Sequence, residues 1–154
     1  MKTRTILASL AVFFAGFALC LAADPNMGTW KLNEARSKFS PGAPKNHTVV
    51  YQEVGDSVKV TVDGVDKDGK AAHHEWTGKF DGKDYPVTGD PTSDMRAYTR
   101  VNERTLDFTA KAGGKVTATG RVVVAADGKS RRVTVSGKDA SGMEMKSSAV
   151  YDKQ

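Results

Sequence analysis

The chain of 154 residues is poor in cysteine and in the apolar residues that helices favour. Residues 24–154 contain no cysteine, no isoleucine and only two leucines, Leu32 and Leu106, but they contain 16 valines and 12 threonines. Valine and threonine are stiff at χ1 and suit pleated strands. This composition argues against a helical bundle and against α/β folds. Without a cysteine, residues 24–154 can form neither a disulfide nor a cysteine-ligated metal site.

The excess of positive charge is also small. The net charge is +5, and Lys2 and Arg4 account for two of these charges, so residues 24–154 carry +3. This is too little for a nucleic-acid footprint, and the aromatic residues do not alternate with a basic stripe. No nucleophile-elbow, phosphate-loop or zinc-helix motif is present. We therefore predict no nucleic-acid partner, no metal, no cofactor and no catalytic residue.

Residues 1–23 have the order of a secretory signal. Lys2 and Arg4 precede an apolar run from 6 to 21, and Ala22 and Ala23 follow it. A run of this length is short for a membrane span, which needs about 20 residues. We expect cleavage after Ala22 or Ala23, export to the periplasm or beyond, and no transmembrane segment after cleavage. The alternative is a lipid anchor on Cys20.

Residues 24–154 suit one domain, and turn signals divide them into segments of strand length. Asp-Gly and Gly-Gly pairs suit tight hairpins. Between the turns, apolar and polar residues alternate, as in an antiparallel sheet with one wet face. We predict an all-β, antiparallel up-and-down barrel of nine or ten strands, because closure removes exposed edges. The exceptions are a short edge strand near 85–87, a loop at 88–93 and a non-strand segment at 34–45 with at most two helical turns. The predicted turns are Gly55-Asp56, Asp68-Gly69-Lys70, Asp81-Gly82-Lys83, Asn102-Glu103, Gly113-Gly114, Asp127-Gly128-Lys129 and Ser141-Gly142.

The alternation also predicts which side chains face the interior. In the segment 71–80 the more apolar set is inward, namely His74, Trp76 and Phe80, with His73 and Glu75 outward. Two further strands give the same kind of prediction. One inward set is Val116, Ala118, Val122 and Val124, and the other is Met95, Ala97, Thr99 and Val101. The second set leaves Arg96, Tyr98 and Arg100 as an outward, solvated row; in the alternative the arginines point inward and clamp a carboxylate or phosphate.

The two ends of residues 24–154 resemble a known superfamily. Gly28-Thr29-Trp30 is similar to the Gly-x-Trp motif that opens the barrels of lipocalins and fatty-acid-binding proteins (the calycins). The resemblance implies that Gly28 and Trp30 are structural, with the indole packed across a closed end. Tyr151 matches the tyrosine of the Arg-x-Tyr ending with which fatty-acid-binding proteins hold a lipid carboxylate, but Ala149 replaces the arginine. The chain also resembles exported bacterial lipocalin-like domains without an established activity.

These observations support a small-molecule binding protein that carries or sequesters an apolar or amphipathic ligand. Small inward side chains in a wide barrel leave volume that a ligand can fill. His74 would bond the polar end of the ligand. One alternative is a filled barrel that acts through its surface as an envelope interaction or inhibitor module, and another is a haem-dependent or acid–base enzyme. The sequence gives no signal of oligomeric state. The predicted ligand-binding residues are His74, Trp76, Phe108, Met145 and Tyr151.

Overall fold

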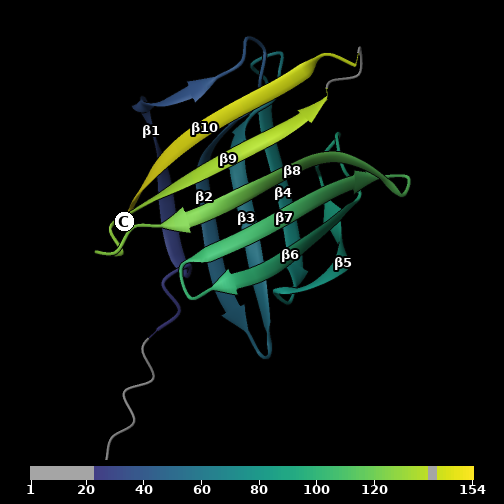
Figure 1. Ribbon diagram of the computed structural model, residues 1–154. Coiled ribbons are helices and arrows are strands. Elements are labelled where there is room, and N and C mark those ends of the chain that lie inside the picture. Colours follow the sequence, from purple (N-terminus) through teal and green to yellow (C-terminus); the bar gives the residue numbers. More distant parts are fainter. Residues whose placement is uncertain (1–22, 139–141) are drawn as a thin grey trace, which may run out of the picture.

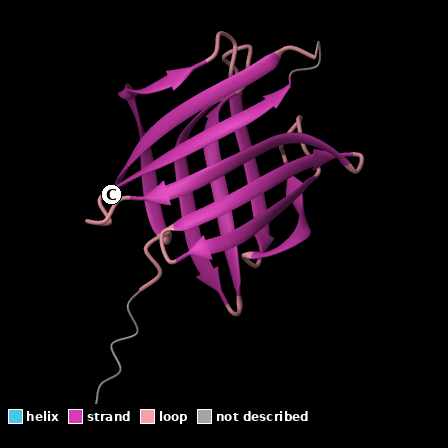
Figure 2. Ribbon diagram, in the orientation of Figure 1, coloured by secondary structure: helices cyan, strands magenta, loops and turns pink. Residues whose placement is uncertain are grey.

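The computed structural model describes residues 23–138 and 142–154 and contains ten strands and no helix in these residues. The predicted signal segment and Cys20 lie outside the described residues, apart from Ala23. Figures 1 and 2 show the strands wound as one sheet. The strands are β1 (Gly28–Phe39), β2 (Lys45–Val54), β3 (Ser57–Val65), β4 (Ala71–Gly78), β5 (Asp81–Thr88), β6 (Met95–Asn102), β7 (Thr105–Ala112), β8 (Lys115–Val124), β9 (Ser130–Lys138) and β10 (Glu144–Lys153).

The sheet closes on itself, which confirms the predicted antiparallel up-and-down barrel. Each strand pairs with its sequence neighbours, and β1 pairs with β10 to complete the ring, with Leu32 opposite Tyr151. The barrel is flattened, so that β2, β3 and β4 form one layer behind β6 to β9 (Figure 1). Every strand has two neighbours, although β1 pairs with β2 only over Gly28–Lys31.

The segment 34–45 was predicted as non-strand, and this prediction is wrong for its first half. β1 continues to Phe39, with a register shift between Asn33 and Lys38. Within this irregularity the Ser37 hydroxyl donates to Asn33 O (2.7 Å) and accepts from Val150 N (2.8 Å). A side chain thus supplies the bonds that the ladder loses. The polar sequence gave no apolar alternation from which this extension could be predicted.

The Asp81-Gly82-Lys83 signal marks a bulge and not a turn. These residues begin β5, the register shifts between Asp81 and Asp84, and Gly82 has a φ of 80°, which a side chain would disfavour. The chain reverses just before, at 79–80. β5 is also not an edge strand, although it pairs with β4 through only two residue pairs.

A second bulge changes which way Val116 faces. Ala110 pairs with Ala118, but Lys111 pairs with Val116, so Thr117 is the extra residue. Val116 therefore shares the outer face with Lys111 and is 58% exposed. Its predicted inward position is wrong, because a one-residue slip reverses every side chain beyond it.

The face assignment of β6 is reversed as well. Tyr98 is buried and Val101 is 51% exposed, so the arginine-bearing face is the inner one. Of the set predicted to face inward, Ala97 is nevertheless buried, at 9% exposed. Arg96 pairs with Asp90 and Arg100 pairs with Asp24. The prediction counted apolar residues, but the cost of burying an arginine falls when a carboxylate pairs with it.

Residues 24–27 cover one end of the barrel, and we call them the N-terminal plug. Trp30 is fully buried below them, and its indole donates to Asn26 O (3.0 Å). Asn26 is itself fully buried, and its amide donates to Asp24 (2.8 Å) and to Glu103 O (3.1 Å). The connections β1–β2, β3–β4, β5–β6 and β7–β8 lie at the opposite end, which we call the loop end.

Candidate functional site

The inner face carries large side chains near the plug and small ones near the loop end. Arg131 and Tyr151 face each other next to the plug, and Phe108 lies farther along, where its ring occupies the space that a Cβ of Gly120 would need. Nearer the loop end, one cross-strand row of β6 to β10 consists mainly of small residues. This row, the small-residue row, is Arg96, Ala110, Ala118, Gly137 and Met145.

His74 lies on the inner face of the opposite layer, opposite Val62 in the ladder. Its Nε2 atom is buried and has no hydrogen-bond partner among the described residues. Burial, together with the positive charge of Arg96, lowers the pKa of His74 to about 4. The ring is therefore neutral near pH 7, when it can donate from one nitrogen and accept at the other.

His73 faces the opposite way, which confirms the predicted faces of these adjacent histidines. Its side chain is 57% exposed, and its Nδ1 lies 2.6 Å from Asp63 Oδ1. The hydrogen bond to Asp63 raises the pKa of His73. The two histidines therefore have opposite electrostatic surroundings, although they are neighbours in the chain.

The loop at 89–94 carries a carboxylate to the inner face beside His74. Gly89 lies so close to His73 O that a Cβ there would be 2.3 Å from it, and this close approach brings Asp90 inward. Asp90 forms an ion pair with Arg96 (2.9 Å), and both side chains are nearly buried. Burial raises the pKa of Asp90, but hydrogen bonds from Ser93 and Thr92 and the charge of Arg96 outweigh this and lower it.

The polar cluster at this level is incompletely bonded. Asp90 accepts from Thr92 N (2.8 Å), Thr92 Oγ1 (2.7 Å), Ser93 Oγ (2.6 Å) and Arg96 Nη2 (2.9 Å). Arg96 Nε, by contrast, is buried without a partner among the described residues, as is His74 Nε2. Buried polar atoms are nearly always hydrogen-bonded, so these two atoms require water or a ligand.

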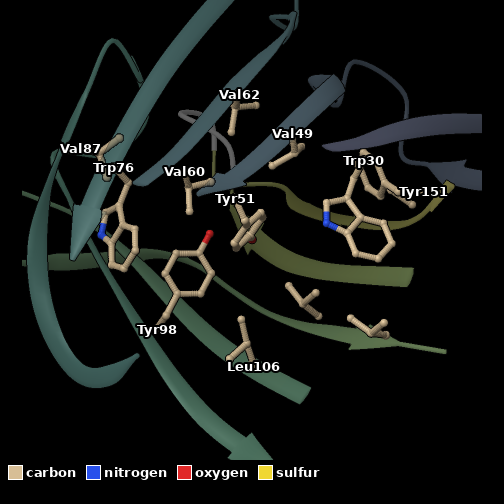
Figure 3. Close-up of a cluster of buried hydrophobic side chains, with 13 residues drawn as sticks. Trp30, Val49, Tyr51, Val60, Val62, Trp76, Val87, Tyr98, Leu106 and Tyr151 are labelled. Atoms are coloured by element: carbon tan, nitrogen blue, oxygen red, sulfur yellow. The ribbon is translucent and has the colours of Figure 1, made fainter. Parts of the chain in front are cut away.

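An aromatic cluster fills the middle of the barrel, and Figure 3 shows the Tyr98 ring between Trp76 and Tyr51. The Tyr98 ring lies 4.8 Å from that of Trp76, 6.5 Å from that of Tyr51 and 5.7 Å from that of Phe108. The Trp76 indole donates to Arg96 O (2.9 Å), which ties this cluster to the polar one. Trp76 and Phe108 thus belong to one cluster, with Tyr98 between them.

Arg131 is the second buried arginine, and no carboxylate of the described residues pairs with it. It is 2% exposed, and its guanidinium carbon lies 4.7 Å from the ring centres of Trp30 and Tyr51 and 5.2 Å from that of Tyr151. Its Nε and Nη1 atoms lack partners in the described part of the chain. Burial raises the pKa of Tyr151 to about 12, so this phenol is neutral and does not balance the charge. Attraction between a cation and aromatic ring faces is the stabilisation that the contacts provide.

The five predicted ligand-binding residues do not form one site. His74 and Trp76 share a face of β4, and Phe108 joins them through the aromatic cluster. Tyr151 lies in the Arg131 layer, and Met145 lies six residues away in the small-residue row, a separation of about 20 Å along β10. A single ligand that touched both would need to be long.

Two open depressions lie on the outer face of β7 to β10. One of about 300 Å³ lies around Val116 and Thr119, and one of about 510 Å³ lies around Asp107 and Arg121. Of the predicted ligand-binding residues only Phe108 contributes to either lining. No cluster of three His, Cys, Asp or Glu side chains suited to a metal ion occurs within 23–138 and 142–154. The same residues contain no helix that could cross a membrane.

Sequence reasoning missed three residues of the interior polar groups. Arg131 has the parity of Val133 and Val135, so extending their alternation by two residues would have placed it inside. Arg96 was assigned to the wrong face. Asp90 gave no signal, because a loop residue has no parity from which to predict its direction.

Comparison with known proteins adds two solved structures. No family model matches the chain, and no curated protein matches it. A redesigned β-barrel, mFAP1, bound to DFHBI, is 14% identical, with 86% of this chain and 98% of that chain covered and a TM-score of 0.48. EF1p2_mFAP2b bound to DFHBI is 15% identical, with 86% and 97% covered and a TM-score of 0.47. Likeness at this level carries no conclusion about function.

Proposed function

We propose that this protein is an exported small-molecule binding protein that holds an apolar or amphipathic ligand inside the barrel. The observation that carries the proposal is the set of buried polar atoms on the inner face that no described residue bonds, at His74, Arg96 and Arg131. Leaving such atoms unbonded costs about 1–3 kcal/mol each, and more for a charged group. A ligand with a polar end removes part of this cost.

The inner face supports the same proposal through its small residues. Ala110, Ala118 and Gly137 lie side by side in the small-residue row, between Arg96 and Met145. Methionine adapts to irregular apolar partners. Hydrocarbon placed over this row would gain about 25 cal/mol per Å² of apolar surface, before the costs of binding.

The plug favours one direction of entry. The hydrogen bonds of Asp24 and Asn26 cover the end above Trp30, whereas small inner residues lie toward the loop end. Export is proposed from the charged, apolar and small-residue order of residues 1–23. Asp24, the first residue of the plug, follows directly on the expected cleavage site.

Native mass spectrometry of the protein purified from its own host tests the binding function. We expect a copurified small molecule, and after delipidation we expect uptake of a neutral fluorescent lipid probe. His74→Ala should weaken a polar-headed ligand more than His73→Ala, the matched change on the outer face of the same strand. Protein that arrives empty and takes up no probe would refute the proposal.

A second function is favoured by the position of the depressions. Both lie on the outer face, and Val116 is 58% exposed beside one of them. A filled barrel that acts through its surface as an interaction or inhibitor module would bind a partner there. In that case Val116→Asp would abolish partner capture in a pull-down from the host envelope, and His74→Ala would not.

A further inference from the structure

The polar cluster around Asp90 has its charges balanced but its hydrogen bonds incomplete. Arg96 is paired with Asp90, and His74 is neutral near pH 7. The two unbonded atoms are Arg96 Nε, which can only donate, and His74 Nε2, which donates or accepts according to the tautomer. A ligand group at this point must therefore supply hydrogen bonds and does not need to supply charge.

Different polar groups satisfy these two atoms to different extents. A hydroxyl accepts from Arg96, and it donates to His74 in one tautomer and accepts from it in the other. A carboxylate satisfies His74 in only one tautomer, and it would meet the Asp90 carboxylate, which repels it. An ammonium cannot accept from Arg96. The hydroxyl is thus the group that suits both atoms in either state.

The neighbouring side chains leave the cluster apolar on both sides. Val62 faces His74 across the ladder, and Ala110 faces Arg96. Both are nearly fully buried, at 3% and 5% exposed. From Ala110 the small-residue row continues to Met145, so a chain attached to the hydroxyl would lie against apolar surface.

We propose that His74 and Arg96 form a subsite for a hydroxyl group, and that the ligand of this barrel is a neutral alcohol with an apolar body. The inference rests on the proposed binding function and names the class of ligand. The alternative polar subsite is Arg131, whose charge no carboxylate of the described residues balances and which would therefore select a carboxylate. Arg131 is enclosed by Trp30, Tyr51 and Tyr151 beside the plug, away from the small-residue row.

The test compares three probes with the same chain, dodecan-1-ol, dodecanoate and dodecane, by displacement of Nile red from the delipidated protein at pH 7.5. We expect dodecan-1-ol to bind at least about tenfold more tightly than the other two, the effect of one hydrogen bond of ordinary strength. His74→Leu should remove this preference, and His73→Leu, on the outer face, should keep it. The comparison of the three probes uses the wild-type protein, so it remains a test even if a variant fails to fold.

Two results would overturn the inference while leaving the binding function intact. Tightest binding of dodecanoate, weakened by Arg131→Met but not by His74→Leu, would place the polar subsite at Arg131. Equal binding of all three probes would show that the two atoms hold only water. If the protein takes up no Nile red, or if none of the three probes displaces it, the proposed function itself would be refuted.

Discussion

The two adjacent histidines should affect stability in opposite directions as the pH changes. His74 has a pKa of about 4 in the folded protein, and an unfolded histidine has one near 6.5. Between these values the unfolded chain binds a proton that the folded chain does not, so lowering the pH favours unfolding. From pH 7.5 to pH 4.5 this linkage amounts to about 2–3 kcal/mol, since each pKa unit corresponds to about 1.4 kcal/mol.

The assay is urea unfolding at several pH values between 4.5 and 7.5, followed by tryptophan fluorescence. The wild-type protein and His74→Gln should differ in the pH dependence of the unfolding free energy by about 2–3 kcal/mol over this range, because the variant lacks the titrating ring. His73→Gln gives the control of opposite sign. Asp63 raises the pKa of His73, so the stabilisation that this residue provides is present at low pH and is lost as the pH rises through its folded value. Equal pH dependence in the wild-type and His74→Gln proteins would show that His74 is solvated, and the reasoning about its burial would fail.

Three further predictions concern the parts of the fold that position the site. Asp90→Asn should lower the unfolding free energy by about 3 kcal/mol in urea titrations, because it leaves a nearly buried arginine unpaired. Asp107→Asn breaks an ion pair whose side chains are 41–55% exposed and should cost less than about 1 kcal/mol. Similar losses in the two variants would contradict the burial argument. Leu106→Ala, at a fully buried position, should cost about 2–5 kcal/mol by the same measurement, and Val101→Ala, which is 51% exposed, should cost almost nothing; a small loss at Leu106 would mean a loose core. Asp24→Ala removes the hydrogen bonds and the ion pair that Asp24 makes in the plug, and it should lower the melting temperature. It should also speed up the hydrogen exchange of the Trp30 indole proton, measured by NMR. Unchanged hydrogen exchange would show that the plug does not protect this end.

Much of the fold was predictable because alternation of apolar and polar residues is a local property. Parity, together with the more apolar character of one set, placed His74 and Trp76 inside and His73 outside, and the structure agrees. Strand number and antiparallel order followed from the turn signals. Where a bulge shifts the register, as at Thr117, parity fails for the residues beyond it, and Val116 is an example.

The candidate site was harder to predict, because its polar groups depend on partners that are distant in the sequence. Arg100 pairs with Asp24, which is distant in the sequence, so nothing within β6 reveals that its arginines can face inward. Arg131 is different, because the parity of Val133 and Val135 in its own strand would have placed it inside. The prediction compared only the number of apolar residues on each face, and it therefore placed the wrong face of β6 inside. Asp90 follows Gly89, which has no side chain and therefore lets the loop approach the backbone of β4.

The amino-acid sequence by itself determined that the fold is all-β, where most of the strands turn, and which way β4 faces, since all three depend on neighbours a few residues apart. Tertiary structure alone decided the register in which β1 meets β10, that residues 24–27 cover one end, and which interior atoms are left without a partner among the described residues. Those outcomes depend on register between strands and on charges brought together from distant positions, and neither is encoded in any short stretch of the chain.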